Sequence, residues 1–330
     1  MIEKYSDFVP PLGLRNGHIQ SLISSSAIRR RLVLRRSQAV RQQGEVWTLD
    51  GGDGIRLQGL LTRQPGESKG LVVLLHGWEG SVNSNYVLGN SARLFGAGFD
   101  IFRLNFRDHG DTHHLNHEIF HSCRLDEVVC ALRDLQDRLD VGKWFLAGYS
   151  LGGNFAMRVG LRAKQDGVNI RHIVAVCPVI NPANAMLSME QGIRFYERYF
   201  ERKWSRSLRI KKAAFPDLYG GESWHDIKGL RERTHYLATR HAGFGSADEY
   251  FEGYSIADDR LVALDVPATI LTSADDPVVP VSDFYELPDN PKLELIISKY
   301  GGHCGFLKNR KLESMAEDLL EQRFLEPAAD

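Results

Sequence analysis

Short, uninterrupted apolar runs alternate with amphipathic helical patterns along most of this chain. The clearest run is Leu-Val-Val-Leu-Leu at residues 71–75. Similar strand-like runs occur at 99–106, 144–147, 173–176, 268–272 and 293–297. Helical patterns occupy residues 85–95, 125–139, 151–164 and 312–323. A strand that is apolar at every position must be buried on both faces, as the strands of a parallel sheet are. The alternation therefore predicts an α/β fold with a mostly parallel central sheet and helices on both faces.

Composition divides the chain into three regions. Residues 1–44 form an N-terminal arm rich in arginine and serine, whereas residues 45–180 and 261–330 carry the strand–helix alternation. Residues 181–260 are aromatic and charged and lack a strand-like run, so we expect a helical cap inserted into the core. Because this insertion lies between two core strands, we expect it to cover the site as a lid. Most of its aromatic side chains should pack the cap onto the core, and a minority should line an acyl pocket.

The first strand pair is predicted to be a hairpin. Runs at 45–49 and 55–62 flank the turn Asp50-Gly51-Gly52-Asp53-Gly54. Asp-Gly and Gly-Gly pairs supply the positive φ angles that tight hairpin turns need.

The sharpest motif is Gly148-Tyr149-Ser150-Leu151-Gly152. A G-x-S-x-G motif alone is weak, because chance would supply one in roughly one chain in five of this composition. Here a strand-like run precedes it and a helical pattern follows, which is the setting of a nucleophile elbow. The two glycines leave room for close backbone approach, and the helix N-terminus directs its N–H groups at developing negative charge. We therefore predict that Ser150 is a nucleophile; the alternative is a glycine-bounded turn with an ordinary serine.

Chain order selects the base among 12 histidines. In hydrolases with such an elbow, an acid and then a histidine follow the serine along the chain. The stretch Gly301-Gly302-His303-Cys304-Gly305 follows the last predicted strand, so His303 is the expected base. A glycine-rich loop in that position allows the imidazole to reach the serine. The alternative is a loop histidine without a role.

The acid should end the preceding strand, where Asp275 and Asp276 compete. Its task is to hold the histidine tautomer and to stabilise the imidazolium. We prefer Asp276, because the residue before Pro277 is held extended. Asp275 stays open as the alternative.

The oxyanion hole should combine two backbone donors. The residue after the serine, Leu151, supplies one N–H group, and the loop after the third predicted strand supplies the second. That loop reads His76-Gly77-Trp78-Glu79-Gly80, and the N–H group of Trp78 is the expected donor. A plain turn is the alternative.

These motifs, in this order, resemble the YheT-like α/β hydrolases. The resemblance rests on residues 76–81 (HGWEGS), 105–107 (NFR), 148–153 (GYSLGG), 275–277 (DDP) and 302–303 (GH). The N-terminal stretch NGHIQS at 16–21 is similar to the family's N-G-H-L-Q-T signature. The resemblance implies an α/β-hydrolase fold and a carboxylesterase or lipase that acts on acyl esters or acylglycerols through Ser150, Asp276 and His303. Residues 107–111 (RDHGD) depart from the small residues usual in relatives, which leaves the substrate open.

Other features exclude or weaken competing functions. The net charge of −1 does not favour nucleic acid as a partner. Cys123, Cys130, Cys177 and Cys304 are irregularly spaced, which argues against a disulfide framework or a structural zinc site. Five histidines cluster at positions 109, 113, 114, 117 and 121, but few acids or cysteines stand at ligand spacing. We expect these to be loop and core histidines, with His121 structural, and we expect neither a metal nor a cofactor.

The sequence also carries signals for the cellular location of the protein and for its contact with membranes. Neither a secretory signal nor an apolar run of about 20 residues is present, so we expect a cytoplasmic protein. Arginines 29–31, 35 and 36 should form a solvated face; a weak peripheral contact with an anionic membrane is the alternative.

The predicted function is hydrolysis of short- to medium-chain acyl esters or acylglycerols through an acyl-enzyme. Three rivals stay open, namely an acyltransferase that uses an alcohol in place of water, a catalytically silent binding protein on the same scaffold, and a serine peptidase or amidase.

Overall fold

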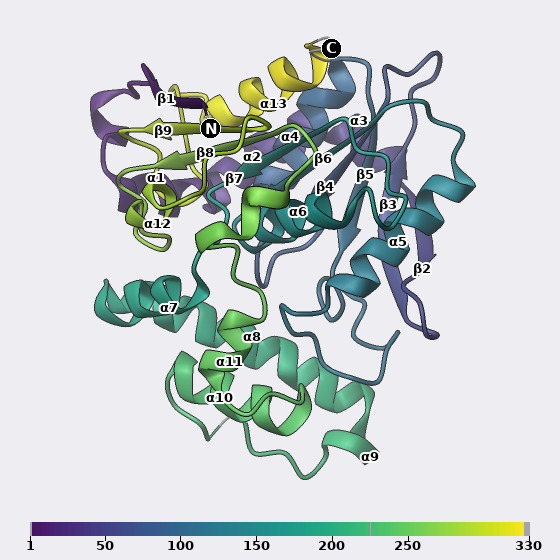
Figure 1. Ribbon diagram of the computed structural model, residues 1–330, viewed down its shortest axis with the longest axis vertical. Helices are drawn as coiled ribbons and strands as arrows, with labels where there is room; N and C mark the ends of the chain where they lie inside the picture. The colour runs from purple at the N-terminus through teal and green to yellow at the C-terminus, as the bar shows by residue number, and fades with distance from the viewer. Residues whose placement is uncertain (1, 225, 327–330) are drawn as a thin grey trace.

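The structure is a computed structural model that describes residues 2–224 and 226–326. Its centre is a nine-stranded sheet with the order β1-β9-β8-β7-β6-β4-β5-β3-β2 (Figure 1). The strands are β1 (Ile2–Ser6), β2 (Glu45–Asp50), β3 (Arg56–Thr62), β4 (Leu71–Leu75), β5 (Asp100–Asn105), β6 (Trp144–Tyr149), β7 (His172–Val176), β8 (Ala268–Ser273) and β9 (Leu293–Ser298). Only β3 runs against its neighbours β2 and β5; the other pairs of this sheet are parallel.

Helices cover both faces of the sheet because the buried strands are apolar on both sides. Successive residues of β4 illustrate this: Val73 joins one hydrophobic core and Val72 joins the other. The first core includes α5 (Leu125–Arg138) and α6 (Leu151–Arg162), and the second includes α4 (Asn85–Gly96) and α13 (Met315–Leu325).

The strand and helix predictions agree with these bounds to within a few residues. The predicted hairpin is present between β2 and β3, where Gly51 N donates to Ile55 O at 2.8 Å. The last predicted helix begins three residues later than expected, at Met315. Strand β1 was not predicted, because Ile-Glu-Lys-Tyr-Ser is a polar edge strand without an apolar run.

The N-terminal arm packs on the sheet. Strand β1 pairs in parallel with β9. After it come η1 (Leu12–Leu14), α1 (Gly17–Ser24), α2 (Ala27–Arg36) and α3 (Gln38–Gln42). Arg29 is 1% exposed and forms an ion pair with Glu317 of α13 at 2.9 Å. The arm is therefore anchored to the core by backbone pairing at one end and by a buried ion pair at the other.

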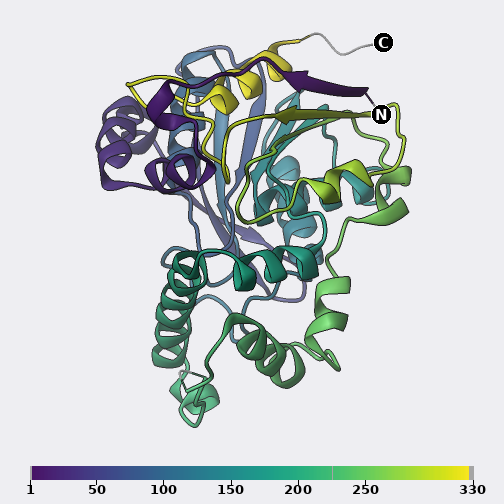
Figure 2. The same cartoon turned by 90° about the vertical axis from the view of Figure 1, so that its left-hand side faces the viewer.

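The insertion between β7 and β8 forms a helical layer beyond the carboxyl edge of the sheet (Figures 1 and 2). Its described helices are α7 (Pro182–Gln191), α8 (Arg194–Ala214), α9 (Pro216–Tyr219), α10 (Leu230–His241) and α11 (Ala247–Glu252). Elements η2 (Asp258–Ala263) and α12 (Ser282–Tyr285) lie on either side of β8 in the chain. Within residues 2–224 and 226–326, no helix combines the length and apolar character that crossing a bilayer requires.

Candidate active site

Ser150 occupies a strained turn between β6 and α6. Its φ angle is 55°, a conformation that residues other than glycine rarely adopt. A Cβ atom on Gly148 would lie 2.0 Å from Gly152 O, and one on Gly152 would lie 2.4 Å from His76 O. The motif therefore needs glycine at both positions, because the strand, the helix and the neighbouring loop approach without room for a side chain.

His303 joins Ser150 to Asp276. Its Nε2 lies 3.0 Å from Ser150 Oγ, and its Nδ1 lies 2.9 Å from Asp276 Oδ2. The Asp276 side chain is fully buried, and its Oδ1 also accepts hydrogen bonds from the backbone N–H groups of Val278 and Val279. Burial alone would lower the pKa of His303, but the Asp276 carboxylate and the neighbouring Cys304 together outweigh it and hold that pKa well above the ordinary value.

The two candidate aspartates have different hydrogen-bond partners. Asp276 faces the imidazole, as preferred from the sequence, whereas Asp275 Oδ1 accepts a hydrogen bond from Gly302 N at 2.8 Å. Asp275 thus holds the backbone just before His303. The two neighbouring carboxyl groups position the same histidine from different sides.

Helix α1 supports the histidine loop, a role that the sequence did not reveal. Gln20 Oε1 accepts from Leu307 N at 2.7 Å, and Gln20 Nε2 donates to Leu307 O at 3.3 Å. Ser21 Oγ accepts from His303 N at 2.8 Å. A Cβ atom on Gly17 would lie 2.0 Å from Asp275 O. The NGHIQS segment is therefore a clamp on the loop that carries His303; its glycine and buried glutamine are the signal that could have suggested this.

Two buried histidines hold the loop that carries Trp78. His76 Nδ1 lies 2.8 Å from Gly77 O, and His109 Nε2 accepts from Glu79 N at 3.1 Å. Burial lowers the pKa of His76 to about 4, so that this imidazole is neutral near pH 7. His109 belongs to the histidine cluster of the sequence, and its contact shows that it positions the predicted oxyanion loop.

Trp78 and Leu151 both line a cavity together with Ser150. The Trp78 ring stacks on Phe200 at a centroid distance of 5.2 Å and meets Trp204 edge-on at 5.1 Å, both from α8. The backbone of Trp78 thus lies in the predicted oxyanion loop while its side chain contacts the cap.

Glu79 follows Trp78 in this loop and lines the second cavity of the site. Burial raises the pKa of its carboxyl group to about 8, although nearby Lys203 opposes the shift. Near pH 7 the group is mainly neutral and does not oppose negative charge on a reacting oxygen.

The first cavity is apolar. Its lining joins the elbow to the cap and includes Val179, Met186, Met189, Phe200, Trp204 and Leu237. The cap aromatics that line it are Phe200, Trp204, Tyr250, Phe251 and Tyr254. Trp224 is instead fully buried within the cap, and Phe195 is 49% exposed.

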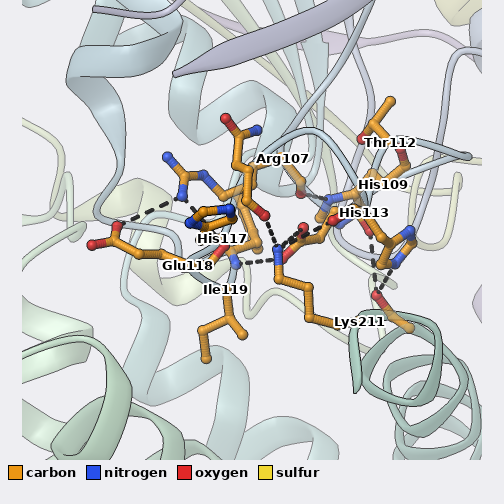
Figure 3. Close-up of polar contacts among 12 residues, drawn as sticks. Arg107, His109, Thr112, His113, His117, Glu118, Ile119 and Lys211 are labelled. Atoms are coloured by element: carbon orange, nitrogen blue, oxygen red, sulfur yellow. Dashed lines mark hydrogen bonds and ion pairs between the residues drawn. The ribbon is translucent and has the colours of Figure 1, made fainter. Parts of the chain in front are cut away.

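The second cavity is a polar basin, which also reaches Ser150 and is bordered by His303. Its wall contains Asp108 and His113. Figure 3 shows His113 near Lys211 of α8. Lys211 Nζ donates to Asp108 Oδ1 at 2.8 Å, to His113 O at 3.3 Å and to Asn116 O at 2.5 Å. His113 Nε2 lies 2.8 Å from Ser207 Oγ. These contacts fasten α8 to the loop after β5.

The histidine cluster does not assemble a metal site in the described part of the chain. His117 packs against Phe215, and His121 packs against Phe244. Among the described residues, the group of three potential ligands that does come together is Cys177, His303 and Cys304.

Several known proteins are similar to this chain. A family model described as the alpha/beta hydrolase fold matches residues 70–309. The chain is 26% identical over 310 residues to the Escherichia coli (strain K12) protein named "Putative esterase YheT", covering 92% of this chain and 87% of that protein. It is 24% identical over 318 residues to an abhydrolase domain-containing protein of Dictyostelium discoideum, covering 91% and 76%. A solved esterase of Pyrococcus furiosus has a TM-score of 0.58 at 15% identity, covering 86% of this chain and 89% of that one, a likeness in fold alone.

Proposed function

Because this chain belongs to the α/β-hydrolase fold family, we propose that it is a serine hydrolase that cleaves carboxylic esters. The family match and the YheT relative confirm the fold class and the resemblance predicted from the motifs. One observation carries the proposal. The two ring nitrogens of His303 lie 3.0 Å from Ser150 Oγ and 2.9 Å from Asp276 Oδ2. The relative named "Putative esterase YheT" supports an ester as the substrate.

The proposed reaction starts at Ser150. Its Oγ attacks the ester carbonyl while His303 Nε2 takes the hydroxyl proton and Asp276 stabilises the imidazolium. The N–H groups of Leu151 and Trp78 are the proposed donors to the oxyanion. As the tetrahedral intermediate collapses, His303 protonates the leaving alcohol, and an acyl-enzyme remains on Ser150. Water, deprotonated by His303, then attacks the acyl carbonyl and releases the acid.

The two cavities suggest where each half of the ester binds. The leaving oxygen must lie next to His303 to receive its proton, and His303 borders the polar basin but not the apolar cavity. We therefore assign the alcohol to the basin and the acyl chain to the apolar cavity, which fits short- to medium-chain acyl esters or acylglycerols.

Labelling with a fluorophosphonate and a series of p-nitrophenyl esters from C2 to C16 test this function. We expect stoichiometric labelling and hydrolysis, both abolished by Ser150→Ala. Labelling that survives Ser150→Ala would refute the assignment of the nucleophile, and a folded chain without labelling would favour a silent binding protein. Product analysis with added alcohol separates hydrolysis from acyl transfer, and a peptide substrate tests the peptidase alternative.

The predicted location and membrane contact stay predictions. Four free cysteines are consistent with the reducing cytoplasm that we propose. Of the arginines considered for membrane contact, Arg29 is buried, and Arg36 pairs with Glu317 at 3.3 Å. A contact with anionic lipid would thus depend on the remaining arginines.

A further inference from the structure

Two thiols lie beside His303. Cys177 directly follows β7, and Cys304 follows His303 on the loop after β9; both are buried and free. The Cys304 backbone N–H donates to Cys177 Sγ at 3.4 Å. One ring nitrogen of His303 and the two Sγ atoms lie within 4.8 Å of one another. Sequence spacing could not reveal this cluster, because Cys177 and Cys304 are 127 positions apart.

We propose that Cys177, Cys304 and His303 bind one soft divalent cation, such as Zn²⁺ or Cd²⁺, and that the bound ion inhibits the hydrolase. Two thiolates and one imidazole are a ligand set that these ions favour. With Zn–S bonds of about 2.3 Å, tetrahedral geometry needs sulfur atoms about 3.8 Å apart. The distance between the two Sγ atoms must therefore shorten by about 1 Å at most. Cys304 and His303 line the polar basin, which offers an entry path and leaves the fourth position to water.

The bound ion inhibits the hydrolase whichever ring nitrogen of His303 it uses. This step rests on the proposed function. Each thiol releases one proton to solvent when it binds the ion, and the imidazole binds in its neutral form. A cation on Nε2 displaces Ser150 from its base. A cation on Nδ1 displaces Asp276 and leaves the ring proton on Nε2, which then cannot accept the serine proton. Either arrangement stops catalysis.

Cadmium titration tests the site independently of activity. We expect one equivalent of Cd²⁺ per reduced chain to produce the ultraviolet thiolate-to-cadmium charge-transfer band. Cys177→Ala and Cys304→Ala should each remove the one-equivalent end point, whereas Cys130→Ala, which changes a thiol outside the cluster, should keep it. Circular dichroism checks that each variant is folded. If Cys177→Ala is not folded, Cys177→Ser replaces it. Equal titrations of the wild type and both cluster variants would overturn the site.

Inhibition is tested on the same proteins with a p-nitrophenyl ester. Buffered Zn²⁺ at about 10 μM should lower kcat at least 10-fold and block fluorophosphonate labelling, both reversed by a chelator. Cys177→Ala and Cys304→Ala should remain active and require at least 100-fold more Zn²⁺, whereas Cys130→Ala should respond like the wild type. Inhibition unchanged in the cluster variants would overturn the proposal. A chain that binds cadmium through these thiols but cleaves no ester would refute the proposed function and leave the metal site standing.

Discussion

At the scale of single residues, opposing effects set the pKa of His303. Its burial disfavours the imidazolium, whereas the Asp276 carboxylate at 2.9 Å and the neighbouring Cys304 together favour it more strongly, so the pKa of His303 is raised. The base must be neutral to accept the Ser150 proton. A raised pKa therefore moves the loss of activity on acidification to a higher pH than an ordinary histidine would give.

We predict that kcat/KM for a neutral ester rises with pH through a midpoint above the ordinary histidine value of about 6.5. Asp276→Asn should move this midpoint to lower pH, because the carboxylate that favours the imidazolium is gone. It should also lower kcat by a factor on the order of 10⁴. Rates measured from about pH 5 to about pH 9, on both sides of the ordinary histidine pKa, check both effects. A midpoint that Asp276→Asn leaves unmoved would contradict the assigned cause.

The neighbouring carboxyl group supplies a matched comparison. Asp275→Asn keeps an oxygen that can accept from Gly302 N, so we expect kcat to fall by less than about 10-fold with no change in the pH midpoint. Asp275→Ala should lower kcat further because it frees the loop. Kinetics of both variants beside Asp276→Asn test the division of roles, which would be wrong if Asp275→Asn were as inactive as Asp276→Asn.

At the scale of elements, α1 acts on catalysis from outside the cavities. Gln20→Leu should leave the backbone N–H of Leu307 without its partner and lower the free energy of unfolding by about 1–3 kcal/mol. Because the clamped loop carries His303, kcat should fall more than KM changes. Leu22→Ala, at a 44% exposed position of the same helix, is the control and should have little effect on either quantity. Urea unfolding and ester kinetics provide the readout.

Helix α8 is fastened to the core by a buried ion pair. Lys211 is 1% and Asp108 5% exposed, and their charged atoms are 2.8 Å apart. Lys211→Met should leave the Asp108 carboxylate buried without its partner and cost about 3–5 kcal/mol of folding free energy. Adding Asp108→Asn should recover a large part of that loss, since no lone charge remains. Thermal unfolding of the three variants measures this, and equal stabilities of Lys211→Met and the double variant would argue against the pair.

At the scale of the whole molecule, the site lies where the sheet and the cap meet. The sheet supplies Ser150, Asp276 and His303 at the carboxyl ends of three parallel strands, and the cap closes the apolar cavity. Met186 of α7 lines that cavity, whereas the next residue, Leu187, is 43% exposed.

Met186→Trp should therefore shorten the acyl chains that the enzyme accepts. We expect kcat/KM for an octanoyl ester to fall by about 10-fold or more, with that for an acetyl ester nearly unchanged. Leu187→Trp adds the same side chain outside the cavity and should leave the chain-length profile as in the wild type. A profile unaltered by Met186→Trp would place the acyl chain elsewhere.

The fold class, the elbow and the chain order of the three candidate site residues could all be predicted from the amino-acid sequence. Continuous apolar runs demand burial on both faces, and the glycines around Ser150 answer a local steric requirement, so neither depends on distant contacts. Strand β1 carried no such signal, because a polar edge strand exists only by pairing with β9.

The tertiary structure alone decided which aspartate faces His303, what the NGHIQS segment holds and which thiols meet. Each of these depends on loops from distant parts of the chain arriving at the same edge of the sheet. It also decided that Arg29, one of a run of surface-like arginines, is buried against Glu317. The reason is common to all of them: local patterns specify elements, whereas the partner of a polar side chain is set by the packing of elements far apart in the sequence.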